Sequence, residues 1–431
     1  MTGLSRPQPL GVLPLPAGWL VVPADVADRP DVAHAVRRLL AGHLPDPWPG
    51  ELEAMRLALF GDVEAAAARV DPAEGAEHAY DHFVLTGEPS SLELARATAS
   101  GQLAALVEVA AFALGHADAL PDAGEGSGLD GELGAHVLTA HAAARLEQGD
   151  AQGALNALVA AEAAARPVSP VLAATLLGQQ AALAHQVNGA DGDVVAAYRE
   201  AVDMLRGAEA VETVAGELAL GLATALQELA AETAENAGNG NPLLVQAIQA
   251  YHLALRLLRK ESQPERYAFA HSNLALAYLA MPMVAERDKL RRGVAVQSLR
   301  EALTFYTPAE HPREWASITL NLANALQHLP TTHPVENLVE AVGMYDELLE
   351  VRTADADPLG HARVLANQGT ALGHLGIHDQ ARLKLLAAQE IFTRHGDGSS
   401  ASTVREALVG IDAAAGRAAS DGAVASAAAQ G

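Results

Sequence analysis

The stretch from residue 264 to residue 392 contains three copies of one pattern, and this repeat constrains the fold more than any other feature. Each copy begins with a Pro, has an Asn nine residues later at the start of a small-residue run, and reaches a helix breaker eighteen residues after the Pro. The copies begin at Pro264, Pro312 and Pro358, so the period is 46 to 48 residues. Such a period is typical of repeat proteins, in which each unit buries its apolar face against the next.

The composition favours helices over strands. Half of the 431 residues are hydrophobic, and only 4% are aromatic. The apolar residues are mostly Ala and Leu, which are strong helix formers, whereas strands are enriched in β-branched and aromatic residues. Together with the repeat, this composition predicts an all-α solenoid.

Breakers and changes of composition divide the chain into segments. Pro is excluded from helix interiors, so the Pro-rich start is expected to be mostly irregular. The Gly-rich stretch after residue 116 has no strand before it and no Lys behind it, so it is a linker and not a phosphate-binding loop. The predicted segments are a Pro-rich arm with one short helix (1–49), degenerate helical repeats (50–115), an acidic Gly-rich linker (116–133), the solenoid (134–395), a capping helix (402–419) and a disordered tail (420–431).

The hairpins after the linker resemble tetratricopeptide repeats (TPR). The motif's positions are matched by Ala142, Gly149, Asp150, Ala154, Leu158 and Ala161, and again by Gly369, Ala371, Gly376, Ala381, Leu385 and Ala388, with Leu at the position of the motif's aromatic residue. The resemblance covers 134–395 and implies a right-handed α-solenoid whose concave face holds a partner peptide or helix. The period exceeds the roughly 34 residues of the family. We attribute the difference to inserted turns between the two helices of a hairpin, the longest at 283–293.

Some TPR proteins grip a carboxylate with a Lys and an Asn on the first helix of a hairpin. In this chain only Asn324 falls on the Asn position, where the other hairpins carry Thr224, Leu276 and Thr370. The Lys position holds Leu220, Ser272, Leu320 and Ala366. We therefore expect no carboxylate clamp of this kind.

Residues 294–345 are also similar to bacterial TPR proteins associated with nickel–iron hydrogenase gene clusters. This resemblance implies an alternative function, an accessory or assembly chaperone that holds an apo-subunit of a metalloenzyme.

The first helices of the hairpins supply the candidate partner-binding groove. Polar side chains on a concave, Ala-rich surface suit an extended peptide or a partner helix, although a solvated helix face explains them equally well. The candidate groove residues are Thr224, Gln227, Ser317, Asn324, Gln327, His328, Arg363, Thr370 and His374.

A basic insert is the second candidate. The chain has 28 basic and 53 acidic residues, a net charge of −25, but Arg287, Lys289, Arg291 and Arg292 cluster in the longest insert. An acidic partner segment could dock there by charge pairing. The competing interpretation is pairing within the chain, with Glu261, Glu265, Glu286 and Glu301.

Several function classes are disfavoured. The chain has no Cys, which excludes disulfides and thiolate metal sites. The pairs His374/His378 and His328/His333 straddle turns, so we expect no metal and no cofactor. The acidic charge repels nucleic acid and anionic membranes, and no apolar run approaches the roughly 20 residues of a membrane span.

No catalytic constellation stands out, so we predict a non-enzymatic, cytoplasmic, bacterial scaffold or adaptor with a protein or peptide partner. A ligand-sensing TPR regulator is a further alternative. The first 130 residues contain no basic recognition helix, which counts against it. The oligomeric state is open.

Overall fold

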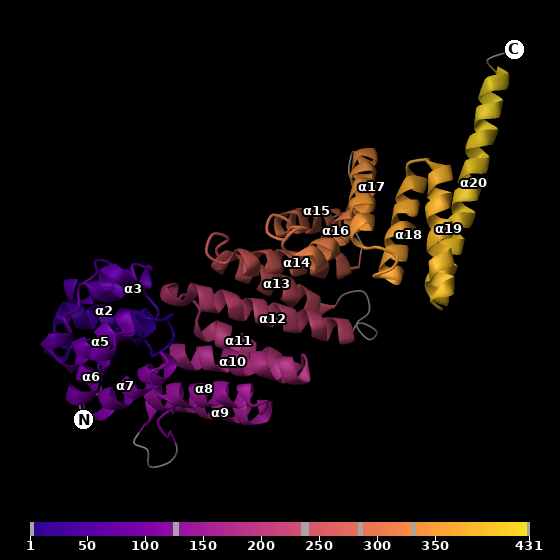
Figure 1. The fold of residues 1–431 in the computed structure, drawn as a ribbon. Helices are drawn as coiled ribbons and strands as arrows, with labels where there is room; N and C mark the ends of the chain where they lie inside the picture. Colours follow the sequence, from indigo (N-terminus) through magenta and orange to yellow (C-terminus); the bar gives the residue numbers. More distant parts are fainter. Residues whose placement is uncertain (1–3, 124–128, 234–240, 283–287, 330–332, 429–431) are drawn as a thin grey trace. The chain divides into compact units, whose positions relative to one another are not determined.

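The computed structural model describes residues 4–123, 129–233, 241–282, 288–329 and 333–428. Within these ranges it contains helices and turns and no strand (Figure 1). Residues 1–233 with 256–258 form one compact unit, unit 1, and residues 234–255 with 259–431 form a second, unit 2. The predicted all-α solenoid of TPR-like hairpins is confirmed.

Unit 1 begins with short helices and continues with longer hairpins. The short helices are α1 (Ala24–Ala27), α2 (Pro30–Leu40), α3 (Glu53–Leu59), α4 (Val63–Ala67), α5 (Ala76–Thr86), α6 (Pro89–Thr98) and α7 (Gly101–Ala113). The longer helices are α8 (Gly131–Glu147), α9 (Ala151–Ala165), α10 (Pro170–Asn188), α11 (Gly192–Met204) and α12 (Glu212–Glu232). The turn predicted between α8 and α9 is present: Gly149 has a φ of +79°, and the Asp150 side chain accepts a hydrogen bond from the amide of Gly153 at 2.8 Å.

The Pro-rich arm is anchored to the rest of unit 1 by buried polar contacts. The Tyr80 hydroxyl donates to the carbonyl of Trp19 at 3.0 Å, and the amide of Val21 donates to a carboxylate oxygen of Asp81 at 2.9 Å. The Trp19 ring packs edge-on against His136, with centroids 4.8 Å apart. Trp19 thus packs the arm against α8.

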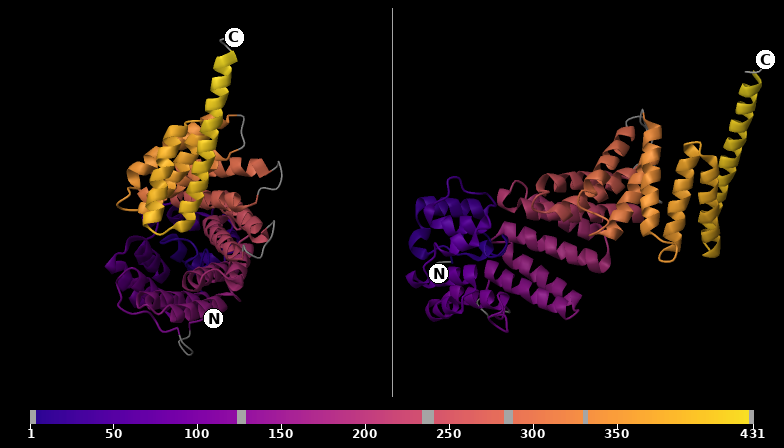
Figure 2. Two further views of the ribbon diagram at one scale, coloured as in Figure 1. Left: turned by 90° about the vertical axis from the view of Figure 1, so that its right-hand side faces the viewer. Right: turned by 45° about the horizontal axis from the view of Figure 1, so that its top comes forward.

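Unit 2 contains the three copies of the repeat as three helical hairpins, seen from two further sides in Figure 2. They are α14 (Pro264–Ala280) with α15 (Asp288–Ala302), α16 (Pro312–Gln327) with α17 (Pro334–Val351), and α18 (Pro358–His374) with α19 (His378–Arg394). Helix α13 (Pro242–Leu257) precedes them and α20 (Gly398–Ala428) follows. Each first helix starts at the repeated Pro, where a missing amide N–H leaves no helical hydrogen bond unmade.

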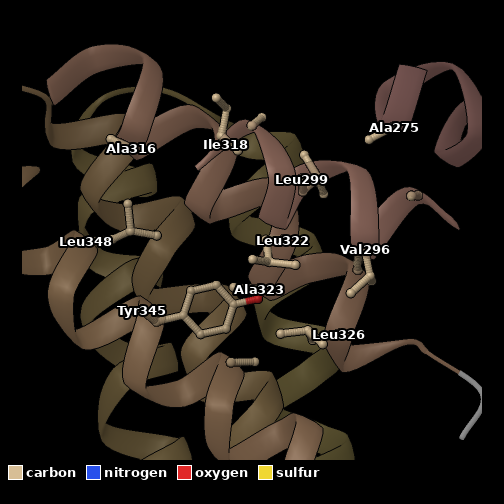
Figure 3. Close-up of a cluster of buried hydrophobic side chains, with 14 of the residues drawn as sticks. Ala275, Val296, Leu299, Ala316, Ile318, Leu322, Ala323, Leu326, Tyr345 and Leu348 are labelled. Atoms are coloured by element: carbon tan, nitrogen blue, oxygen red, sulfur yellow. The ribbon is translucent and has the colours of Figure 1, made fainter. Parts of the chain in front are cut away.

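Small and aromatic residues together build the seams between these helices. Buried Tyr345 and Leu348 of α17 face Leu322, Ala323 and Leu326 of α16 (Figure 3). Ala allows close approach of the helix backbones, and the larger side chains fill the space beside it. The repeated small residues are therefore a requirement of packing.

Two segments differ from the sequence-based expectation. Helix α15 starts at Asp288, so residues 288–293 of the predicted insert are helical, because Leu and Arg there are strong helix formers. Helix α20 starts earlier than the predicted capping helix of 402–419 and continues through Ala428. The Ala-rich composition that suggested a disordered tail also has the highest helix propensity.

Judged by length and composition alone, the stretch Glu209–Glu232, which contains α12, could cross a membrane, and it is the one such stretch in the described ranges. Of its most apolar window, 56% is buried inside the fold. Buried core helices pass the same test.

Candidate partner-binding face

Seven of the nine predicted groove residues lie on two consecutive first helices of unit 2. Helix α16 carries Ser317, Asn324 and Gln327, with His328 as its C-terminal cap, and α18 carries Arg363, Thr370 and His374. These seven residues are called the helix-A face below.

The other two predicted residues, Thr224 and Gln227, lie on α12 of unit 1. Both are half-buried. The Thr224 hydroxyl donates to the carbonyl of Leu220 in its own helix at 3.0 Å. Among the described residues, the buried Oε1 of Gln227 has no hydrogen-bond partner.

A buried tyrosine organises the centre of the helix-A face. The Tyr345 hydroxyl donates to Asn324 Oδ1 at 2.7 Å and lies 3.3 Å from Gln327 Oε1. Asn367 Nδ2 donates to the same Asn324 oxygen at 2.8 Å. With its oxygen held from two helices, the Asn324 amide is fixed in orientation, which is the kind of preorganisation that favours binding. Burial raises the pKa of Tyr345, so the hydroxyl stays a donor.

The periphery of the helix-A face is open. Ser317, His328, Arg363 and His374 are exposed, whereas Thr370 is half-buried and donates to the carbonyl of Ala366 at 2.9 Å. The exposed members could therefore contact a partner without disturbing the core.

The basic insert is only partly described, and the described part is helical. Arg287 lies outside the described residues, and Lys289, Arg291 and Arg292 belong to the first turns of α15. Arg291 Nη1 contacts the sulfur of Met281 at 3.5 Å, and Arg292 Nη1 donates to the carbonyl of His328 at 2.7 Å. The insert and the helix-A face thus meet at the end of α16, which spacing along the sequence did not reveal.

Other basic residues near the insert pair within the chain. Lys260 forms an ion pair with Glu301, and Arg300 binds the carboxylate of Glu340 at 2.8 Å. Glu301, one of the acidic residues considered as a partner for the insert, is thus paired with Lys260.

Sequence reasoning missed two features. The first is the hydrogen bond from Tyr345 to Asn324, for which the available signal was that a buried tyrosine hydroxyl normally has a partner. The second is a buried polar cluster in unit 1, where Arg6 of the arm forms an ion pair with Glu132 of α8 beside His136. Nothing in the local sequence links residues this far apart.

The arrangement offers hydrogen-bond donors and acceptors for a bound chain. Amides and hydroxyls on a helical face can bind the backbone and side chains of a peptide. In the described ranges, no three His, Asp or Glu side chains lie close enough together to hold a metal ion.

No protein-family model and no curated protein matches the chain. Among solved structures, it is similar to the apo form of RapI, at 11% identity and a TM-score of 0.41, covering 84% of this chain and 95% of that chain. It is also similar to a Rap protein complexed with competence and sporulation factor, at 14% identity and a TM-score of 0.37, covering 85% of this chain and 97% of that chain. A third similar structure is the TPR2AB domain of yeast Sti1 in a pHSP90 complex, at 17% identity and a TM-score of 0.25, covering 64% of this chain and 98% of that chain. Likenesses this distant assign no function and no residue role to this chain.

Proposed function

We propose that the protein is a cytoplasmic, non-enzymatic interaction scaffold whose helix-A face in unit 2 holds a peptide or a helix of a partner protein. The observation that carries this proposal is the amide of Asn324, held in place by Tyr345 and Asn367 at the centre of an otherwise open polar row. A merely solvated helix face needs no such support, because water satisfies any side-chain orientation.

The exposed members of the row reinforce the proposal. Ser317 and Arg363 occupy the same position in consecutive repeats, five residues after Pro312 and Pro358. Because corresponding positions of stacked repeats line one surface, a bound chain would pass both in turn. No core contact requires either residue to be polar, since both are exposed.

The test is capture of partners from native lysate, with protein identification by mass spectrometry. The variant Ser317→Tyr/Arg363→Ala obstructs the face without touching the Asn324 network. The matched control, Glu347→Ala/Leu383→Tyr, makes the same kinds of change at exposed positions of the second helices α17 and α19.

A partner retained by the parent and the control, and lost by the face variant, supports the proposal. A partner lost only by the control would place binding on the second helices and refute it. A metalloenzyme apo-subunit among the specifically captured proteins would favour the assembly-chaperone alternative. Circular dichroism melting curves should be the same for all three proteins.

A further inference from the structure

Three groups that carry or can acquire positive charge, from three different helices, converge at one end of the helix-A face. Arg292 of α15 donates to the carbonyl of His328, which caps the C-terminus of α16, at 2.7 Å. His374 ends α18. Partial burial lowers the pKa of His328, and the positive charges of Arg292 and His374 lower it further, so both groups lie within electrostatic range of the His328 ring. We call Arg292, His328 and His374 the basic end.

The surrounding charge is distributed unevenly between the two helices of each hairpin. The second helices α15, α17 and α19 carry two, five and two carboxylates against four, no and three Lys or Arg residues, so α17 alone has an excess of negative charge. The first helices α14, α16 and α18 carry two, Glu265 and Glu314, each in the first turn of its helix. The first helices of an acidic chain are thus nearly free of negative charge, and their acidic residues lie at the end opposite the basic end.

Arg292 also differs from its basic neighbours in what it binds. Lys260 and Arg300 pair with the carboxylates of Glu301 and Glu340. Arg292 instead donates to a neutral carbonyl oxygen, so its charge is not neutralised by that contact. A guanidinium has five N–H donors, and one is used here, which leaves donors for a second acceptor.

We infer that the basic end binds the carboxylate of an acidic peptide lying along the helix-A face. This inference rests on the proposed function and adds the chemistry and direction of the partner. Its Asp or Glu residues lie against Arg292, His328 and His374, and its neutral part lies toward the starts of α14 and α16. Charge complementarity of this kind sets orientation and selects partners. The five carboxylates of α17 repel an acidic peptide from that second helix.

The test is selection of binders from a random dodecapeptide display library against the full chain, followed by fluorescence anisotropy with the enriched peptides. Arg292→Glu reverses the charge at the basic end. Arg292→Gln removes the charge but keeps an N–H donor for the His328 carbonyl, which separates the charge from a structural role. Arg313→Glu is the matched control, because Arg313 is an exposed arginine in the first turn of α16, at the opposite end of the face.

Enriched peptides should be rich in Asp and Glu clustered toward one end. Their affinity should fall about tenfold or more for Arg292→Glu, about threefold for Arg292→Gln, and less than about twofold for Arg313→Glu. Enriched peptides without acidic residues, or acidic peptides bound equally by the parent and Arg292→Glu, would overturn the inference but leave peptide binding in place. If no peptide is enriched over an unrelated target protein, the inference and the proposed function both fail.

Discussion

Acidification should destabilise unit 1 through His136. This histidine is enclosed by Trp19 and by Gly11, where an added Cβ would come within 3.0 Å of its ring. Burial, and then the charge of Arg6, lowers its pKa from 6.5 to about 4. Between these two pH values the unfolded chain binds a proton that the native chain does not, so stability increases with pH across this window.

The magnitude follows from the size of the shift. A pKa difference of about 2.5 units corresponds to about 3 kcal/mol, of which about 2 kcal/mol is already lost at pH 5. The stability is complete above pH 6.5 and lost progressively as the pH falls to about 4. Asp81 acts in the opposite direction, because burial raises its pKa well above the usual value. A variant that changes only His136 separates the two contributions.

The assay compares urea unfolding of the parent and His136→Phe between pH 7.5 and pH 4.5. Phe keeps a ring against Trp19 and removes the titrating group. Replacing Trp48 and Trp315 with Phe in both proteins leaves Trp19 as the fluorescent reporter beside the mutated position. The parent should lose about 2 kcal/mol more than the variant between pH 7.5 and pH 5. Equal losses in the two proteins would refute the reasoning, since they would show that His136 does not titrate differently on folding.

Two further predictions concern unit 2, and thermal unfolding measures both. Tyr345→Phe should destabilise it by about 1 to 2 kcal/mol, because Asn324 loses a buried donor; an unchanged melting temperature would show that this hydrogen bond is not needed. Gly369→Ala should lower the free energy of unfolding by about 1 to 3 kcal/mol, because the added Cβ would lie 2.8 Å from Leu385 Cγ. The control Gly343→Ala should be neutral or stabilising, because a Cβ added there meets no atom within 4 Å. Equal effects of the two glycine changes would contradict the packing described for α18 and α19.

The fold was predictable because local and long-range signals agree. The repeated Pro marks the start of each first helix, and the Ala-rich seams fix how the helices stack. The inserted turns were placed less well, since a breaker shows where α14 ends and does not show where α15 begins. Lys289, Arg291 and Arg292 were therefore assigned to a loop although they lie on a helix.

The candidate site was only partly predictable for a physical reason. Spacing along the sequence shows which residues share a face of one helix, so Ser317 and Asn324 could be grouped. It does not show contacts between residues from different helices. The bond from Arg292 to the carbonyl of His328 and the link between Asn367 and Asn324 both depend on how hairpins pack, and each appeared only in three dimensions.

The central claim, that the helix-A face of unit 2 holds a partner, is tested most directly by site-specific photo-crosslinking. The photoreactive residue p-benzoylphenylalanine replaces Ser317 on this face, or Leu383, which is 69% exposed on the second helix α19. After irradiation in native lysate, we expect a crosslinked partner at position 317 and none at position 383. A partner crosslinked at position 383 and absent at position 317 would contradict the claim.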